Sequence, residues 1–289
     1  KRREVTNMQY GLIGEKLGHS FSAEIHQKLK SHPYALVELA REEIDAFFAA
    51  KDFSAINVTI PYKSTVIPYL SQVSEQARAI GAVNTVVNLG GELWGYNTDF
   101  YGLQSLIAHA GITLEHKKVA ILGTGGTSKT AHAVANFLKA REILTVSRTA
   151  GEGVITYADL MEEHTDVDVI INATPVGMYP NTEATPVDIS QFSNLSGVID
   201  VIYNPLRTQL IIDAQKHGIP AEGGLYMLVS QAAYAVEKFI DTPVDNDKVE
   251  QIFKNLYKDK MNIALIGMPA SGKTSVGKLL SERLSKSFI

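Results

Sequence analysis

Short apolar runs alternate along the chain with longer stretches in which apolar residues recur every three or four positions. The runs have the length and composition of β-strands, and the longer stretches have the period of amphipathic helices. The expected strands are residues 9–14, 34–39, 55–60, 83–89, 118–123, 143–147, 167–172 and 197–202. The expected helices are residues 22–30, 41–50, 63–69, 74–80, 100–110, 127–140, 207–217 and 225–240. This alternation predicts an α/β protein with largely parallel sheets.

The length of 289 residues favours two domains. A polar connector, residues 111–117, precedes the strand expected at 118–123, so we place a domain junction near residues 102–117. A further apolar segment, Asn262 to Gly267, precedes an expected helix from Gly272 and begins another βα unit.

Composition narrows the class of function. The chain has 27 Lys and Arg against 31 Asp and Glu, a net charge of −4, so nucleic acid is not an expected partner. It has no cysteine and no metal-type histidine spacing, so no metal site is expected. The N-terminal residues lack the apolar core of a secretory signal, and no apolar run reaches the roughly 18 residues of a membrane span. We expect a cytoplasmic enzyme with a small-molecule substrate, no membrane partner, and a monomeric or homodimeric state.

A glycine-rich turn follows the strand at 118–123. Gly123, Thr124, Gly125, Gly126 and Thr127 lead directly into a helix, and Ser128 stands where a third glycine is usual. Glycines let the backbone approach a pyrophosphate, which the helix N-terminus then attracts. The context favours dinucleotide binding over a purely structural turn.

The end of the next strand bears on the choice of cofactor. An NAD-specific site would present Asp or Glu there, whereas this chain has Ser147, Arg148 and Thr149. Arginine and hydroxyl groups can hold a 2′-phosphate, which favours NADP; a solvated surface arginine is the less favoured alternative for Arg148. Glu152, close behind, weakens the preference for NADP.

Polar residues gather at strand ends in the first hundred residues, where open α/β sheets form ligand crevices. They suit a small polyhydroxylated anion, although each alone could serve as a turn, a cap or a solvated charge. These residues are Ser20, Ser22, Asn57, Thr59, Lys63, Asn84, Asn97 and Asp99.

At these positions the chain resembles the shikimate dehydrogenase family over residues 9 to about 258. The resemblance lies in several segments that occur in the family's order. They are GHSFS at 18–22, NVTIPYK at 57–63, GAVNT at 81–85, YNTD at 96–99, GTGG at 123–126, NATPVGM at 172–178, DVIYNP at 200–205, and GGLYML at 223–228 with Gln231. Ala23, Phe100 and Glu152 depart from residues frequent in the family.

The resemblance implies reversible, NADP-dependent reduction of 3-dehydroshikimate to shikimate in aromatic amino-acid (chorismate) biosynthesis. It implies a substrate-binding domain at 8–102 joined by C-terminal helices at about 229–258, and a Rossmann-like, doubly wound NADP-binding domain at 103–228. Lys63 and Asp99 would be the catalytic pair. The substrate would be held by Ser20, Ser22, Asn57, Thr59, Asn84 and Gln231. The cofactor would be held by Gly123, Thr124, Gly125, Gly126, Thr127, Ser147, Arg148, Thr149, Thr174, Gly224 and Met227.

A second motif lies near the C-terminus. Residues 267–274 read GMPASGKT and fit a P-loop, in which backbone N–H groups and Lys273 hold phosphates and Thr274 ligates Mg²⁺. Residues 261–289 resemble the first, incomplete unit of a shikimate kinase, with Gly272, Lys273 and Thr274 as phosphate-binding residues. About fifteen residues follow Thr274, so kinase activity is expected to be absent. For this fragment taken alone, a surface loop without nucleotide affinity is the favoured interpretation.

Three alternatives remain open from the sequence. The first is an NAD-dependent quinate/shikimate dehydrogenase. The second is a P-loop phosphotransferase that carries residues 1–258 as an accessory domain, which the missing kinase body disfavours. The third is a ligand-binding relative without catalysis, which the presence of both Lys63 and Asp99 disfavours.

Overall fold

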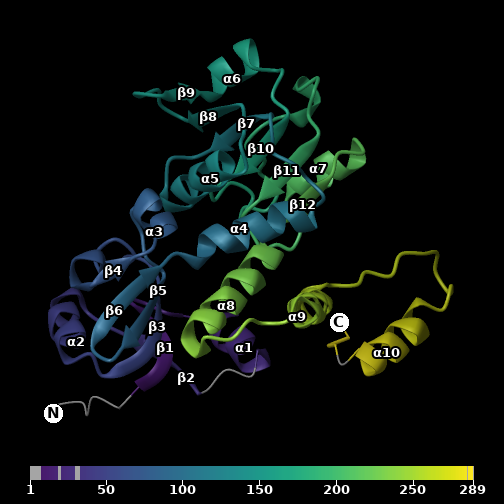
Figure 1. The fold of residues 1–289 in the computed structure, drawn as a ribbon. Coiled ribbons are helices and arrows are strands. Elements are labelled where there is room, and N and C mark those ends of the chain that lie inside the picture. Colours follow the sequence, from purple (N-terminus) through teal and green to yellow (C-terminus); the bar gives the residue numbers. More distant parts are fainter. Residues whose placement is uncertain (1–7, 19–20, 30–32, 285, 289) are drawn as a thin grey trace.

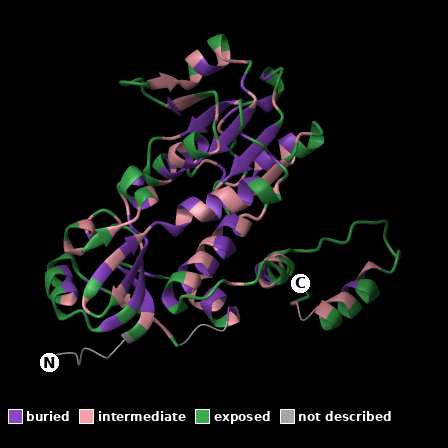
Figure 2. Ribbon diagram, viewed as in Figure 1, coloured by how far each residue is buried: buried purple, intermediate pink, exposed green. Residues whose placement is uncertain are grey.

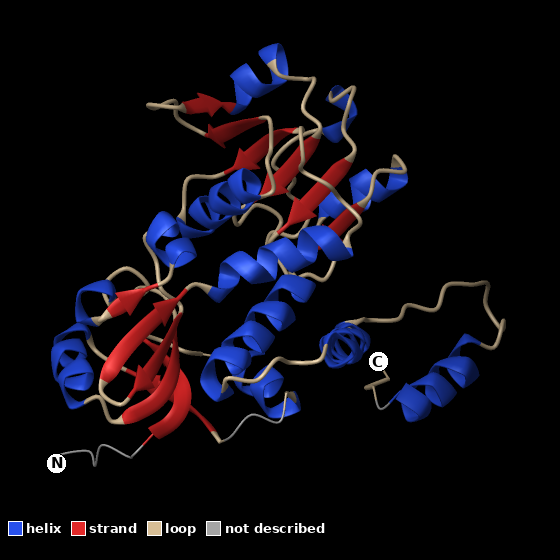
Figure 3. Ribbon diagram, in the orientation of Figure 1, coloured by secondary structure: helices blue, strands red, loops and turns tan. Residues whose placement is uncertain are grey.

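The computed structural model describes residues 8–18, 21–29, 33–284 and 286–288, and within them the chain forms two six-stranded sheets (Figure 1). Long helices run between the sheets, and further helices cover their faces (Figure 3). The predicted α/β class is confirmed.

The first sheet is mixed. Its strands are β1 (Met8–Gly14), β2 (Tyr34–Glu38), β3 (Phe53–Val58), β4 (Gln72–Val73), β5 (Thr85–Leu89) and β6 (Glu92–Tyr96). In the order β2-β1-β3-β5-β6-β4, β1 runs parallel to β2 and β3, whereas β5 runs antiparallel to β3 and β6. Apolar side chains of α2 (Ile44–Ala50) and α3 (Glu75–Ile80) form a core with this sheet. The sheet also contacts α8 (Leu225–Ile240), which lies near α1 (Phe21–Lys28).

The second sheet is parallel throughout. Its strands are β7 (Lys118–Leu122), β8 (Glu142–Ser147), β9 (Val154–Thr156), β10 (Val169–Asn172), β11 (Gly197–Asp200) and β12 (Ala221–Gly223). The order β12-β11-β10-β7-β8-β9 places the reversal of strand order between β7 and β10, which is where doubly wound sheets bind ligands. One core joins the sheet to α4 (Thr98–His109) and α5 (Gly126–Phe137). Another joins it to α6 (Tyr157–Glu163) and α7 (Gln209–Lys216).

The chain passes from the first sheet to the second through α4 and returns through α8 (Leu225–Ile240), after which α9 (Asn246–Lys260) follows (Figure 1). Helices α4 and α8 approach closely because Gly102 has no side chain. A Cβ there would lie 2.8 Å from the Met227 carbonyl oxygen. The two packed helices lie between the two sheets and connect them.

Several sequence predictions need correction. The helix expected at 63–69 is a turn followed by a short 3₁₀ helix at Ile67–Tyr69, because Pro68 lacks the N–H that a longer helix needs. The strand expected at 83–89 begins at Thr85. The pattern also missed short or partly exposed elements, namely β4, β6, β9, β12 and α6. Helix α9 (Asn246–Lys260) overlaps the C-terminal helices at about 229–258 that the resemblance implies.

The strand expected at 262–266 does not form. Residues 261–272 are exposed and contain neither helix nor strand, and they lead to α10 (Lys273–Leu284), which confirms the helix expected in this region (Figure 2). A strand needs a neighbouring strand to pair its backbone groups, and no described strand lies beside this segment. None of the described helices has the length and apolarity to cross a membrane.

Candidate active site

A cavity of about 410 Å³ is lined by residues from both halves of the chain. It brings together many of the residues expected from the sequence: Ser22, Asn57, Thr59, Lys63, Asn84, Asp99, Thr127, Gly224, Met227 and Gln231. Ser20 lies outside the described residues. The cavity combines carboxylate, ammonium, amide and hydroxyl groups, which suits a small polar ligand.

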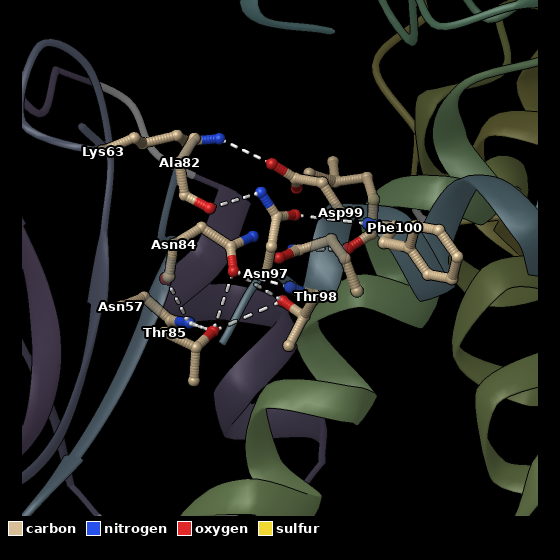
Figure 4. Close-up of polar contacts among 11 residues, drawn as sticks. Asn57, Lys63, Ala82, Asn84, Thr85, Asn97, Thr98, Asp99 and Phe100 are labelled. Atoms are coloured by element: carbon tan, nitrogen blue, oxygen red, sulfur yellow. Dashed lines mark hydrogen bonds and ion pairs between the residues drawn. The ribbon is translucent and has the colours of Figure 1, made fainter. Parts of the chain in front are cut away.

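Lys63 and Asp99 form an ion pair at this cavity. Lys63 Nζ lies 2.6 Å from Asp99 Oδ2, and the side chains are 31% and 20% exposed, so both remain accessible to a ligand (Figure 4). Asp99 occupies the first turn of α4, where the partial positive charge of the helix N-terminus favours a carboxylate. The two residues are therefore held as a charged donor and its carboxylate partner.

The backbone of Ala82 and Val83 is hydrogen-bonded to both Lys63 and the residue that caps the helix of Asp99. The backbone N–H of Val83 donates to the Lys63 carbonyl over 2.7 Å. Asn97 caps α4 by accepting a hydrogen bond from the Phe100 N–H, and its Nδ2 donates to the Ala82 carbonyl over 2.9 Å (Figure 4). Because the cap sets where α4 begins, it also sets the position of Asp99 opposite Lys63.

A buried hydrogen-bond network surrounds Asn57 and Asn84. Asn57 Nδ2 donates to the Asn84 carbonyl over 3.2 Å and to Thr85 Oγ1 over 3.0 Å. Asn84 Oδ1 accepts from the Thr98 N–H over 2.7 Å and from Thr85 Oγ1 over 3.0 Å (Figure 4). Because Asn84 Oδ1 is engaged in this way, its amide nitrogen remains for the cavity.

His26, which also lines the cavity, was not singled out by the sequence. It is 1% exposed and stacks on Tyr34, with ring centroids 3.9 Å apart. Burial lowers the pKa of His26 to about 4, although a hydrogen bond with Asn57 opposes the shift. The imidazole is therefore neutral at physiological pH.

The glycine-rich turn lies at the C-terminal end of β7, as expected. Gly123 has a φ of +108°, and a Cβ there would lie 3.2 Å from the Ala173 carbonyl oxygen, so the turn requires glycine. Thr124, Gly125 and Gly126 are exposed at the start of α5, whose first N–H groups have no partner within the helix. This geometry fits a dinucleotide pyrophosphate. Ser128, in place of the third glycine, is buried.

A buried network shapes the loop after β10. Asp200, at the end of β11, accepts hydrogen bonds from Asn172 Nδ2 over 3.1 Å and from Thr208 Oγ1 over 2.7 Å. Asn172 Oδ1 in turn accepts from Thr174 Oγ1 over 2.7 Å. Burial raises the pKa of Asp200 to about 6 in spite of these hydrogen bonds. The network holds Thr174 beside Gly123, 3.1 Å from the position of a Cβ there.

The remaining expected cofactor residues lie along the same edge of the second sheet. Ser147 ends β8, and Arg148 and Thr149 follow it as exposed residues. Thr124 lines a separate cavity of about 630 Å³ between α3 and α5. The C-terminal ends of β7, β8, β10 and β11 thus present the turn, Arg148, Thr174 and Asp200 along one edge.

The cavity also contains Lys16, Phe21 and Tyr203, which sequence reasoning did not select as site residues. Phe21 on α1 meets Tyr203 after β11 edge to face, with ring centroids 5.5 Å apart. Lys16 and Tyr203 follow the ends of β1 and β11 closely, and this position was the available signal for them. No local pattern showed that segments so far apart in the chain face one cavity.

Comparisons with known proteins agree with this geometry. A family model described as the shikimate dehydrogenase substrate binding domain matches residues 12–86. A protein from Clostridium perfringens (strain 13 / Type A) named shikimate dehydrogenase (NADP(+)) is 34% identical over 264 residues, which cover 86% of this chain and 97% of that protein. The chain belongs to the shikimate dehydrogenase family.

Solved structures of this family share the fold. A chorismate mutase/shikimate 5-dehydrogenase fusion protein from Clostridium acetobutylicum superimposes with a TM-score of 0.80 at 38% identity, covering 86% of this chain and 96% of that one. A shikimate 5-dehydrogenase from Thermus thermophilus, in complex with NADP(H) and shikimate, superimposes with a TM-score of 0.74 at 25% identity, covering 86% and 98%.

Proposed function

We propose that this protein catalyses the reversible, NADP-dependent reduction of 3-dehydroshikimate to shikimate, a reaction of aromatic amino-acid (chorismate) biosynthesis. The observation that carries the proposal is the Lys63–Asp99 ion pair, which faces a cavity that also reaches the nucleotide turn at Thr127. The family membership supports the same reaction, since the curated relative is named for it.

Lys63 donates the proton in this proposal. The cofactor, when bound, supplies the hydride for the ketone carbon. The Lys63 ammonium then protonates the developing alkoxide and stabilises its charge, while Asp99 holds the ammonium in place. In the oxidation direction, the neutral amine of Lys63 accepts the hydroxyl proton.

The cavity residues of the first half would hold the substrate. Ser22, Asn57, Thr59, Asn84 and Gln231 line the cavity and offer hydroxyl and amide groups to a carboxylate and hydroxyls. Ser20 is included in this set on the basis of the sequence resemblance. We assign residues 8–102 and about 229–258 to substrate binding.

Residues 103–228 would bind NADP. The exposed turn at the N-terminus of α5 suits the pyrophosphate, and the exposed Arg148 suits the 2′-phosphate. Gly224 and Met227, at the start of α8, line the cavity on the side that we assign to the nicotinamide, and Thr174 lies beside the turn. The full set is Gly123, Thr124, Gly125, Gly126, Thr127, Ser147, Arg148, Thr149, Thr174, Gly224 and Met227.

Initial rates test the proposal and separate it from the quinate-specific alternative. Purified protein is assayed with shikimate or quinate as reductant and NADP⁺ or NAD⁺ as oxidant. We expect kcat/KM to be highest for shikimate with NADP⁺. Preference for NAD⁺ with either substrate would contradict the cofactor assignment, and lack of turnover in all four combinations would contradict the reaction.

For residues 261–289 we propose only a phosphate-binding loop, with Gly272, Lys273 and Thr274 as its contacts. Its support is the sequence motif at 267–274 and the helix α10 that follows it. Lys273 Nζ lies over the loop and donates to the carbonyls of Gly267 over 2.8 Å and Met268 over 2.6 Å. We expect no ATP consumption in the presence of shikimate. Such consumption would favour the phosphotransferase alternative.

A further inference from the structure

Tyr34, on β2, contacts the site from outside the cavity. Its hydroxyl donates to Asn57 Oδ1 over 2.7 Å. Among the described residues, Asn57 lines the cavity and Tyr34 does not. The phenol hydroxyl is therefore placed to act on the site through Asn57.

The hydroxyl of Tyr34 is held in place by aromatic packing. The ring stacks on His26 at a centroid distance of 3.9 Å and an interplanar angle of 14°. His26 in turn stacks on Phe239 of α8 at 5.8 Å. A ring fixed in this way presents its O–H in one direction, so the hydrogen bond to Asn57 costs little conformational entropy.

The hydrogen bond from Tyr34 begins a longer chain of hydrogen bonds, and the Asn84 carbonyl, which accepts from Asn57 Nδ2, favours the same orientation of the Asn57 amide. Because Asn57 Oδ1 accepts from the phenol, its amide nitrogen faces the other way and donates to Thr85 Oγ1. The Thr85 hydroxyl can then donate to Asn84 Oδ1, which leaves the Asn84 amide nitrogen for the cavity. Asn84 Oδ1 also accepts from the Thr98 N–H, one residue before Asp99 (Figure 4).

We propose that Tyr34 is a positioning residue for substrate binding, which orients the Asn57 amide and, through Thr85, the Asn84 amide nitrogen that remains for the substrate. The inference rests on the proposed function. It adds to the site a residue that would touch neither substrate nor cofactor. Tyr34 is far from Lys63 and Asp99 in the sequence, so the sequence alone does not connect it with the site.

Tyr34→Phe removes only the hydroxyl and keeps the ring that packs on His26. We expect KM for shikimate to rise about two- to tenfold, the range for loss of one hydrogen bond, with KM for NADP⁺ unchanged. Tyr69→Phe is the matched control, since it removes a hydroxyl that bonds Asp45 in the same half of the chain, away from the cavity. That control should leave both KM values unchanged.

A double-mutant cycle with Asn57→Ala tests whether the effect passes through Asn57. In the Asn57→Ala background, Tyr34→Phe should have no further effect on KM for shikimate, since the group that it orients is gone. The inference would be overturned if Tyr34→Phe raised KM for shikimate equally in the Asn57→Ala background. It would also be overturned if Tyr34→Phe alone left KM for shikimate unchanged, or raised KM for NADP⁺ in parallel. Those results leave the proposed function intact, whereas absence of turnover in the wild type would overturn both.

Discussion

Replacement of the buried Asp200 by Asn should change how the free energy of unfolding depends on pH. The carboxyl is 0% exposed and accepts hydrogen bonds from Asn172, Ile202 and Thr208. Burial nevertheless outweighs these hydrogen bonds and raises the pKa of Asp200 from 3.8 to about 6. The folded protein therefore binds this proton more tightly than the unfolded chain does.

The sign and size of the effect follow from that difference. The stability contributed by the Asp200 proton is fully present below about pH 4 and is lost as the pH rises through about 6. One pH unit between the two pKa values corresponds to about 1.4 kcal/mol, so the loss is about 3 kcal/mol. Asn has nearly the same shape, keeps the acceptor for Asn172 and Ile202, and does not titrate.

Urea unfolding of the wild type and of Asp200→Asn, between about pH 4 and pH 7, measures this contribution. Other titrating groups cancel when the two free energies of unfolding are subtracted at each pH. The free energy of the variant minus that of the wild type should rise by about 3 kcal/mol across the range. A difference that stays constant, or that falls with pH, would refute the reasoning.

Two further predictions concern His26 and Arg148. Because burial lowers the pKa of His26 to about 4, the stability that its neutral form contributes is present above about pH 6.5 and is lost as the pH falls through about 4. His26→Phe, which keeps a ring against Tyr34, should remove about 3 kcal/mol of that acid-side loss in urea unfolding, and an unchanged acid-side slope would contradict the assignment. Arg148→Leu should raise KM for NADPH about ten- to a hundredfold, as expected for loss of a hydrogen bond to a charged group, and leave KM for NADH unchanged in initial-rate assays. An equal rise for both cofactors would show that Arg148 does not read the 2′-phosphate.

Much of the fold could be predicted because the buried strands are continuous apolar runs. Strands β7, β10 and β11 are buried along their whole length, and each was expected from its sequence. The hairpin partner β6 was missed because only alternate residues of Glu92–Tyr96 are buried. The segment at 262–266 shows the opposite error, since an apolar run without a neighbouring strand stays irregular.

The sequence predicted which residues belong to the site, but only some of the contacts between them. Resemblance to the family paired Lys63 with Asp99, which the structure places 2.6 Å apart. Nothing local indicated that Tyr34 would meet Asn57, because that contact depends on the pairing of β2 and β3 with β1 and on the packing of α1. Contacts between segments far apart in the chain are fixed by tertiary structure, which local patterns do not contain.

The central claim is that the Lys63 ammonium transfers the proton at the reacting oxygen. The most direct measurement is kcat for reduction of 3-dehydroshikimate by NADPH in Lys63→Ala, together with the dissociation constant for shikimate. Lys139→Ala, which removes a lysine 75% exposed at its side chain and paired with Glu115, serves as the control. We predict that Lys63→Ala lowers kcat by about 10²–10⁴ and weakens shikimate binding only moderately, whereas the control keeps full activity. Near-normal turnover by Lys63→Ala would contradict the account.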